Sequence, residues 1–271
     1  MFSHHALPYV EHELSIFRGD TYLPGYVRLR MAGCDSYGGA LVSRHSGSTS
    51  AAAGGCDGAV VPTLVDWDTG EVIVDSKRIC LLLDAVVPAR QRLRAERLAP
   101  AIDAQLSIVD ELPNYQMLMG RTVAGGEASA TRQDVGASLS RKKVAWCDAY
   151  LRDHAGDPAL VSAYTAKRAK ELSAADDLFS AHAMHAAYAH AEAALADLDG
   201  QLDTRPTRWL LDDALTMADL FWGIELLRMR NVGVAHFWEG GRLPAVEAYL
   251  AAAEALPAIR TAVIDWPGAT F

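Results

Sequence analysis

The chain has few cysteines, and none of them follows a spacing that builds a metal or redox centre. Its 271 residues include 4 cysteines, Cys34, Cys56, Cys80 and Cys147, without a C-x-x-C pair. Zinc sites and dithiol redox sites need closely spaced ligands, so this distribution argues against both. It suits a reducing compartment, with Cys80 and Cys147 as small core residues and with Cys34 and Cys56 as the more accessible thiols.

Basic residues are also scarce relative to acidic ones, and long apolar runs are missing. There are 25 Lys and Arg against 34 Asp and Glu, so the net charge is −9. This balance would repel a phosphate backbone and argues against a nucleic-acid partner. Apolar runs such as residues 79–87 are too short to span a bilayer, and the first residues lack the order of a secretory signal. We expect a cytoplasmic protein without a membrane partner.

The most informative stretch that is present contains a proline-marked strand, a turn, a second strand and a helix start. Residues 60–65 (VVPTLV) and 71–74 (EVIV) are rich in β-branched residues, and the helix opens on Asp75 and Ser76, two side chains able to bind its own free N–H groups. Pro62 cannot donate a ladder hydrogen bond, so there the strand leaves the sheet, bulges or faces a ligand. The start of a helix offers free amides and a positive dipole end to an anion. The pattern predicts a site for a ligand with a free carboxylate.

The remaining pattern predicts an α/β part followed by an all-helical part. Residues 12–17 alternate as in a short strand, residues 22–30 fit a helix, and residues 33–58 fit a long Gly/Ser-rich surface loop. Pro88 marks the boundary, which gives domains at residues 1–88 and 92–271. In the second domain an apolar stripe with steps of three and four predicts a long amphipathic helix. It contains Met184, Tyr188, Ala191, Leu195, Leu198 and Leu202.

A capping box marks a further helix. Thr216 and Asp219 stand in the spacing of such a box, and the residues that follow are apolar almost all round. A helix with this composition belongs in the centre of a domain.

Several segments together resemble the glutathione S-transferase superfamily, in particular its glutathione-dependent reductive dechlorinases of chlorinated hydroquinones. They are residues 26–30 (YVRLR), 60–66 (VVPTLVD), 75–81 (DSKRICL), 215–222 (LTMADLFW) and 266–268 (WPG). The resemblance implies a thioredoxin-like domain followed by a transferase-type helical domain, with the ligand cleft between them. It also implies a homodimer, glutathione as cosubstrate and an electrophilic aromatic as second substrate.

The resemblance assigns the glutathione site to four residues. Val61 would pair its backbone with the cysteinyl part, and a cis peptide before Pro62 would hold that strand edge open. Asp75 and Ser76 would meet the γ-glutamyl end. The alternative from the residues alone is an ordinary proline-marked edge strand followed by a capped helix.

The chain departs from the family pattern at its start. Family members have a further strand and helix, bearing the catalytic Ser or Cys, before the segment that matches residues 12–17. We therefore expect the thioredoxin-like domain to be incomplete, as in a shortened form of a longer protein. The catalytic residue stays unassigned, and Cys34, Cys56 and Ser3 are weak substitutes for it.

Three residues of the helical part are candidates for the substrate pocket. Tyr115 and Met119 follow the first long helix, where this family has the wall of its electrophile pocket, and Trp222 would form the floor. Core packing is the competing explanation, above all for Met119 and Trp222.

His182 and His185 stand one helical turn apart without a third ligand, so we expect no metal. The resemblance implies a reductive dehalogenase that acts on a chlorinated aromatic of the hydroquinone type. The alternative is a catalytically silent binding protein with the same fold, because the segment with the catalytic residue is missing.

Overall fold

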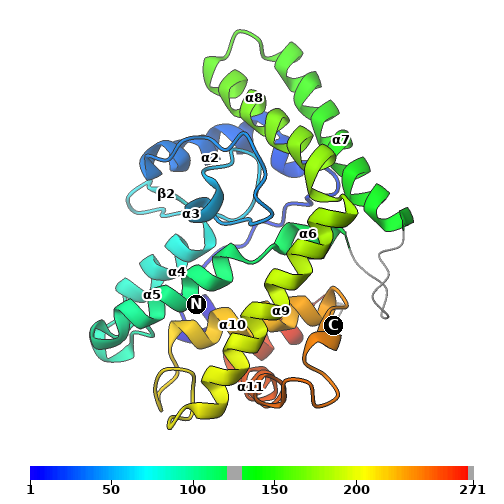
Figure 1. The fold of residues 1–271 in the computed structure, drawn as a ribbon. Coiled ribbons are helices and arrows are strands. Elements are labelled where there is room, and N and C mark those ends of the chain that lie inside the picture. Colours follow the sequence, from blue (N-terminus) through cyan, green and yellow to red (C-terminus); the bar gives the residue numbers. More distant parts are fainter. Residues whose placement is uncertain (121–129, 268–271) are drawn as a thin grey trace.

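The N-terminal part builds a small sheet with helices against it. The structure is a computed structural model that describes residues 1–120 and 130–267, with side chains from residue 135 onward in the second range. The elements of this part are α1 (Phe2–His5), η1 (Asp20–Tyr22), α2 (Pro24–Tyr37), α3 (Ala51–Gly54), β1 (Thr63–Val65), β2 (Val72–Val74) and α4 (Ser76–Ala85). The predicted strand, turn, strand and helix are confirmed, and they lie together on the left of Figure 1.

The sheet has two strands among the described residues and is packed on one face by α2. β1 and β2 are antiparallel, with Thr63 opposite Val74. Val74 is buried in a cluster with Val27 and Met31 of α2. Gly33 of α2 faces the same strand, and a Cβ there would lie 2.6 Å from Val74 Cγ1. A larger residue would therefore force α2 away from the sheet.

Two predictions for this part are wrong. Residues 12–17 form no strand: they run as loop and turn, and Phe17 is 58% exposed, so the alternation does not bury an apolar face. Residues 33–58 are not a surface loop throughout. They contain the end of α2 and all of α3, and Val42, Ala51 and Cys56 are buried. Small residues here permit close packing, which composition alone does not distinguish from mobility.

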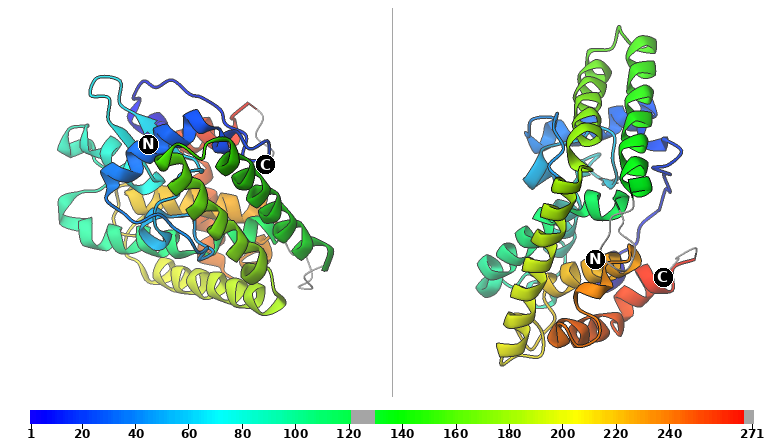
Figure 2. Two further views of the ribbon diagram at one scale, coloured as in Figure 1. Left: turned by 90° about the horizontal axis from the view of Figure 1, so that it is seen from above. Right: turned by 45° about the vertical axis from the view of Figure 1, so that its right-hand side comes forward.

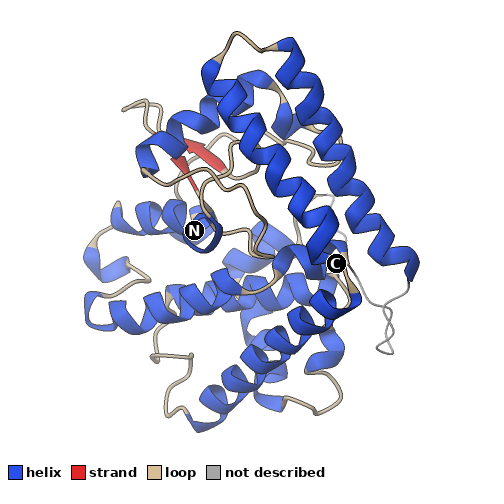
Figure 3. Cartoon of the chain, turned by 45° about the horizontal axis from the view of Figure 1, so that its top comes forward, coloured by secondary structure: helices blue, strands red, loops and turns tan. Residues whose placement is uncertain are grey.

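The rest of the described chain is helical, as predicted, and Figure 3 shows its contrast with the small sheet. Its α-helices are α5 (Ala99–Glu111), α6 (Asn114–Met119), α7 (Ala130–Asp153), α8 (Pro158–Ser173), α9 (Ala181–Thr204), α10 (Met217–Asn231), α11 (Pro244–Glu254) and α12 (Pro257–Ile259). The chain also contains the 3-10 helices η2 (Ala89–Gln91), η3 (Glu96–Leu98) and η5 (Ala235–Phe237) and the π-helical segments η4 (Ala174–Leu178) and η6 (Arg260–Ile264). The division near Pro88 stays a prediction.

Both helix signals in this part are confirmed. The apolar stripe lies on α9, where its members are buried apart from the partly buried Tyr188. The capping box opens α10: Thr216 and Asp219 bond each other's backbone N–H groups. Asp219 also accepts from the Tyr249 hydroxyl at 2.7 Å and from the Leu210 amide at 3.0 Å. The cap therefore ties the central helix to α11 and to the preceding loop.

Two long helices pack as a hairpin beside the sheet. Figure 2 shows α7 and α8 projecting together, and α9 continuing from the end of α8 along the molecule. α8 packs on α2, so the hairpin joins the N-terminal part to the helical part. No helix within the described ranges is both long and apolar enough to cross a membrane.

Candidate functional site

A cavity of about 310 Å³ lies where the proline strand, the start of α4 and the helices α5 and α10 meet. Its polar lining residues come from both parts of the chain and include Arg30, Asp57, Asp75, Ser76, Asp110, Asn114, Lys170, Glu225 and Arg228. Its apolar lining residues include Val60, Val61, Pro62, Cys80, Val109, Leu220, Phe221, Ile224 and Ile259. The cavity thus offers both polar groups and apolar walls to a ligand.

The proline strand at the cavity is held by two residues of α2. The Val61–Pro62 peptide is cis, and Val61 is 40% exposed. The Tyr26 hydroxyl donates to the Val60 carbonyl at 2.7 Å, and the Arg30 guanidinium donates to the Pro62 carbonyl. These bonds fix the backbone on which the predicted contact with a peptide ligand depends. Tyr26 and Arg30 belong to a quoted family segment, yet nothing in their spacing predicts this bonding.

Asp75 uses its carboxylate for the backbone of its own surroundings. Its oxygens accept from the amides of Lys77 at 2.9 Å, Arg78 at 3.2 Å and Ala51 at 2.7 Å, and its φ of 81° is unusual for a residue other than glycine. The expectation of a largely free set of amides at this helix start is therefore wrong. The exposed Ser76 also lines the cavity, and its contact with a ligand stays a prediction.

A second carboxylate stands near this helix start, and sequence reasoning missed it. Lys77 Nζ lies 2.6 Å from Asp110 Oδ2, and Asp110 belongs to α5. Burial raises the pKa of Asp110, and Lys77 and its hydrogen bond oppose that rise. The two residues are 33 positions apart, so no local pattern could have paired them.

Buried charges continue from the cavity toward α8. Asp57 accepts from Lys167 Nζ at 2.8 Å and Lys170 Nζ at 2.9 Å. Burial alone would raise the pKa of Asp57, but the two ammonium groups hold it well below its usual value. Lys167 also pairs with Glu171 at 3.0 Å, and the ammonium groups of Lys167 and Lys143 outweigh burial and lower the pKa of Glu171 to about 2. Burial lowers the pKa of Lys143 and of Lys170, and their carboxylate neighbours Glu171 and Asp57 oppose that change.

The α10 side of the cavity carries a carboxyl group of a different character. Glu225 is 5% exposed, and burial raises its pKa to about 7, while Arg228 and a hydrogen bond from Asn114 oppose that rise. Its nearest cation, Arg228 Nη1, is 3.9 Å away. The Glu225 carboxyl group can therefore donate a hydrogen bond in its protonated form and accept one in its ionised form.

The four residues predicted to bind glutathione, Val61, Pro62, Asp75 and Ser76, all line this cavity. The predicted substrate-pocket residues Tyr115, Met119 and Trp222 are not among the described residues that line it.

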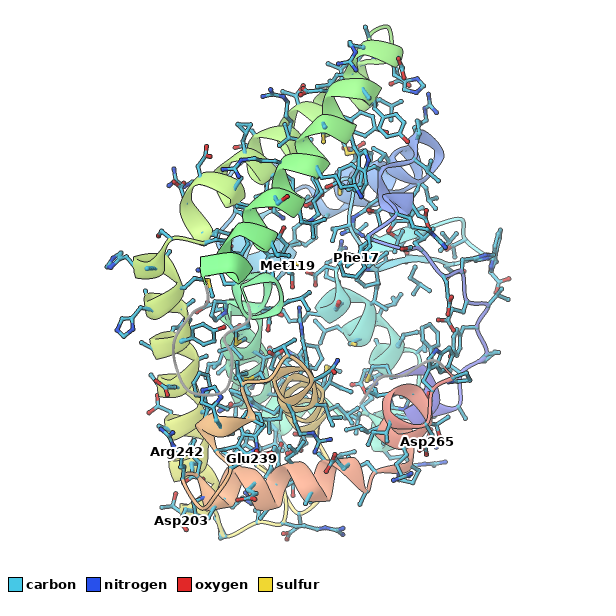
Figure 4. All side chains as sticks on the ribbon, turned by 90° about the vertical axis from the view of Figure 1, so that its right-hand side faces the viewer. Phe17, Met119, Asp203, Glu239, Arg242 and Asp265 are labelled. Atoms are coloured by element: carbon cyan, nitrogen blue, oxygen red, sulfur yellow. The ribbon has the colours of Figure 1, made fainter. Side chains whose placement is uncertain are left out.

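Each of the three is buried elsewhere. The Tyr115 hydroxyl bonds Ser140 at 3.0 Å, and Trp222 Nε1 donates to Gln105 at 2.9 Å. Met119, which is labelled in Figure 4, ends α6. It belongs to the buried cluster that contains Phe179 and Met184. Which residues contact a substrate stays a prediction.

The expected exposure of Cys34 and Cys56 is wrong, because both are buried. Burial raises the pKa of Cys34 to about 12 and also raises the pKa of Cys56. Neither is among the cavity-lining residues, and Ser3 of α1 is not either. Cys80 does line the cavity, and burial raises its pKa to about 11. Since the thiolate is the nucleophile, these environments oppose activation.

His182 and His185 lie in the first turns of α9, and no cluster of three or more metal-binding side chains occurs within residues that the structure describes. In the quoted family segment 266–268, Gly268 lies outside those residues.

Comparison with known proteins places the chain in a family. The profile of the glutathione S-transferase C-terminal domain matches residues 181–252, which span α9, α10 and most of α11. The chain is also similar to the 2,5-dichlorohydroquinone reductive dechlorinase of Sphingobium indicum, from two strains. The identity to each is 36% over 263 residues, which cover 94% of this chain and 75% of the relative. The chain belongs to the glutathione S-transferase superfamily.

Proposed function

We propose that the protein is a glutathione-dependent enzyme that removes chloride reductively from a chlorinated aromatic of the hydroquinone type. The observation that carries the proposal is the single cavity that joins the cis-proline strand and Ser76 to the apolar wall of α10. A tripeptide and an aromatic ring need such a combination of polar and apolar surface. The named relative supports the reaction class.

The residues present fit glutathione. The backbone at Val61 would pair with its cysteinyl part, because Pro62 holds that edge out of the ladder. Ser76, at the first position of α4, would meet the γ-glutamyl carboxylate with its hydroxyl group. One glutathione would supply the thiol that displaces chloride, and a second thiol would remove that sulfur from the ring as a disulfide and leave the reduced ring. Asp75 would position Ser76, since its own carboxylate is occupied by backbone amides.

The other proposed properties follow from the family. The pKa of Cys34, Cys56, Cys80 and Cys147 is raised by burial, so the proposal assigns activation of the sulfur to none of them. We also propose that the protein is cytoplasmic and that it forms a homodimer. Light scattering at several protein concentrations would test the dimer.

Calorimetry with glutathione at millimolar concentration tests the binding half of the proposal. We expect saturable heat from the native chain and at least about tenfold weaker binding by Ser76→Ala, because one charge-assisted hydrogen bond is lost. Glu247→Gln on the exposed face of α11 is the control and should bind normally. No measurable heat from the native chain would remove the glutathione assignment.

Chloride release tests the chemical half. With glutathione and 2,5-dichlorohydroquinone we expect release that depends on both compounds and falls in Ser76→Ala. Glutathione binding without any chloride release would favour the alternative, a silent binding protein with the transferase fold.

A further inference from the structure

Two side chains on the α10 side of the cavity are buried, and each has an oxygen without a hydrogen-bond partner among the described residues. They are Asn114 at the start of α6 and Glu225 of α10, each 5% exposed. The oxygens are Asn114 Oδ1 and Glu225 Oε1. Both residues line the cavity. Buried polar atoms in folded proteins are nearly always satisfied, so two such atoms on one cavity indicate a missing partner.

We propose that Asn114 and Glu225 form a subsite that binds a hydroxyl group of the aromatic substrate. This inference rests on the proposed function and assigns residues to one part of it. A phenolic hydroxyl has one donor and can accept as well. It can donate to Asn114 Oδ1 and accept from a protonated Glu225, which satisfies both orphaned atoms at once. If Glu225 were ionised, its carboxylate and Asn114 Oδ1 would both be acceptors and would compete for the single proton of the phenolic hydroxyl.

The surroundings of the pair fit the ring that carries the hydroxyl. Val109 of α5, Phe221 and Ile224 of α10, and Ile259 of α12 line the same cavity. These side chains are apolar and come from three helices, so they offer a wall to a flat ring. The glutathione residues Val61 and Ser76 belong to the other part of the chain.

The charged groups around the cavity decide the protonation of Glu225. Arg228 on the same helix, with Nη1 at 3.9 Å from Oε2, favours the ionised form. The other charged side chains that line the cavity are Arg30 of α2, Asp57, Asp75, Asp110 of α5 and Lys170 of α8. Burial outweighs both Arg228 and a hydrogen bond from Asn114 and raises the pKa of Glu225 to about 7. The subsite therefore changes its donor count within the physiological range.

The test compares 4-chlorophenol with 4-chloroanisole, which has the same ring but no hydroxyl donor. Binding is measured by calorimetry without glutathione between about pH 5.5 and 8, below the ionisation of a phenol near about 10. We expect 4-chlorophenol to bind the native chain about tenfold more weakly at the upper pH, because an ionised Glu225 donates no hydrogen bond and one of the two acceptors is left without a proton. We expect 4-chloroanisole to bind weakly at every pH.

Three variants sharpen the result. Glu225→Gln keeps a donor and an acceptor of similar shape, so its affinity for 4-chlorophenol should not change with pH. Asn114→Ala should bind about tenfold more weakly at low pH, because one acceptor is lost. Glu247→Gln removes the same charge from exposed α11 and should behave as the native chain.

Three results would overturn the subsite. The first is equal affinity for 4-chlorophenol and 4-chloroanisole. The second is an affinity of Glu225→Gln that still falls with pH as in the native chain. The third is an affinity of the native chain that rises with pH, as binding of an ammonium ligand to an ionised Glu225 would require. Failure of the proposed function can be told apart from failure of the subsite. If the proposed function fails, calorimetry with glutathione gives no heat of binding, whereas the binding of 4-chlorophenol is measured without glutathione.

Discussion

Asp57 and Lys167 form an ion pair in which both side chains are 5% exposed and Nζ lies 2.8 Å from Oδ2. Asp57 belongs to the segment that leads into the cis-proline strand, and Lys167 belongs to α8. The Asp57 carbonyl also accepts from Arg30 Nε, and Arg30 donates to the Pro62 carbonyl. The pair therefore connects the helical hairpin to the strand that lines the cavity. We therefore expect the position of this strand in the cavity to depend on the ion pair between Asp57 and Lys167, which are far apart in the sequence.

Replacing Asp57 tests this connection. Asp57→Asn leaves Lys170 without its buried carboxylate and Lys167 with Glu171 as its remaining partner, so we expect a loss of about 3–5 kcal/mol in the free energy of unfolding. Urea denaturation measures it. Asp148→Asn breaks the more exposed pair with Arg168 and should change stability by less than about 1 kcal/mol. Equal effects of the two variants would show that the buried pair has no special part in stability.

Two glycines of α2 should respond to alanine in opposite directions. At Gly33 a Cβ would meet Val74 Cγ1 at 2.6 Å and the Val72 carbonyl oxygen at 3.0 Å, so Gly33→Ala should destabilise the protein by about 1–3 kcal/mol. At Gly25 nothing lies within 4 Å of a new Cβ, so Gly25→Ala should be neutral or stabilise by up to about 1 kcal/mol. Thermal unfolding of both variants measures the difference, and a stable Gly33→Ala protein would contradict the observed contact of α2 with the sheet.

His45 should make the fold sensitive to acid. Burial, with Lys170 nearby, lowers its pKa from 6.5 to about 3, and its Nδ1 accepts from the Gly47 amide. Between these values the unfolded chain binds a proton that the folded chain does not. Stability therefore falls as pH decreases below 6.5, by up to about 1.4 kcal/mol per pH unit.

His45→Asn keeps an acceptor but cannot titrate, so its unfolding free energy should lack this slope. Urea denaturation from pH 7 to 5 provides the comparison. Glu225, with its pKa raised to about 7, adds a slope of opposite sign in both proteins, so the difference between them isolates His45. Parallel curves for the two proteins would refute the assignment.

The side chain of Asp75 should stabilise the protein because its oxygens accept hydrogen bonds from backbone amides, and not only because it is charged. Asp75→Ala loses three bonds to backbone amides and places alanine at a φ of 81°, so we expect a loss of about 2 kcal/mol or more in stability. Asp75→Asn keeps an acceptor and tolerates positive φ, so its loss should be smaller.

Glutathione affinity of the Asp75 variants should follow the same order, because the cap positions Ser76. Calorimetry and urea denaturation measure the two properties on the same samples. If Asp75→Asn bound glutathione no better than Asp75→Ala, the carboxylate charge itself would be the contact.

Much of the candidate site was predictable from short stretches of the chain. Strand propensity and turn residues predicted the hairpin of β1 and β2, and capping chemistry predicted the starts of α4 at Asp75 and α10 at Thr216. The periodicity of α9 was equally clear. The cis peptide before Pro62 was expected only through the family resemblance. The prediction failed at residues 12–17, where alternation of polar and apolar residues does not bury an apolar face. It also failed at residues 33–58, where a composition of small residues does not mean exposure.

The remaining features were beyond local patterns, because they join residues far apart in the chain. Capping, periodicity and strand propensity depend on residues that are close in sequence. They therefore identify Pro62, Asp75 and Ser76 but do not predict which distant residues lie next to them. The raised pKa of Glu225, the burial of Cys34 and the pairing of Asp57 with Lys167 depend on which surfaces exclude water. Desolvation and long-range packing arise only when the helices come together, and they place Asn114 and Glu225 on the cavity that the proline strand opens.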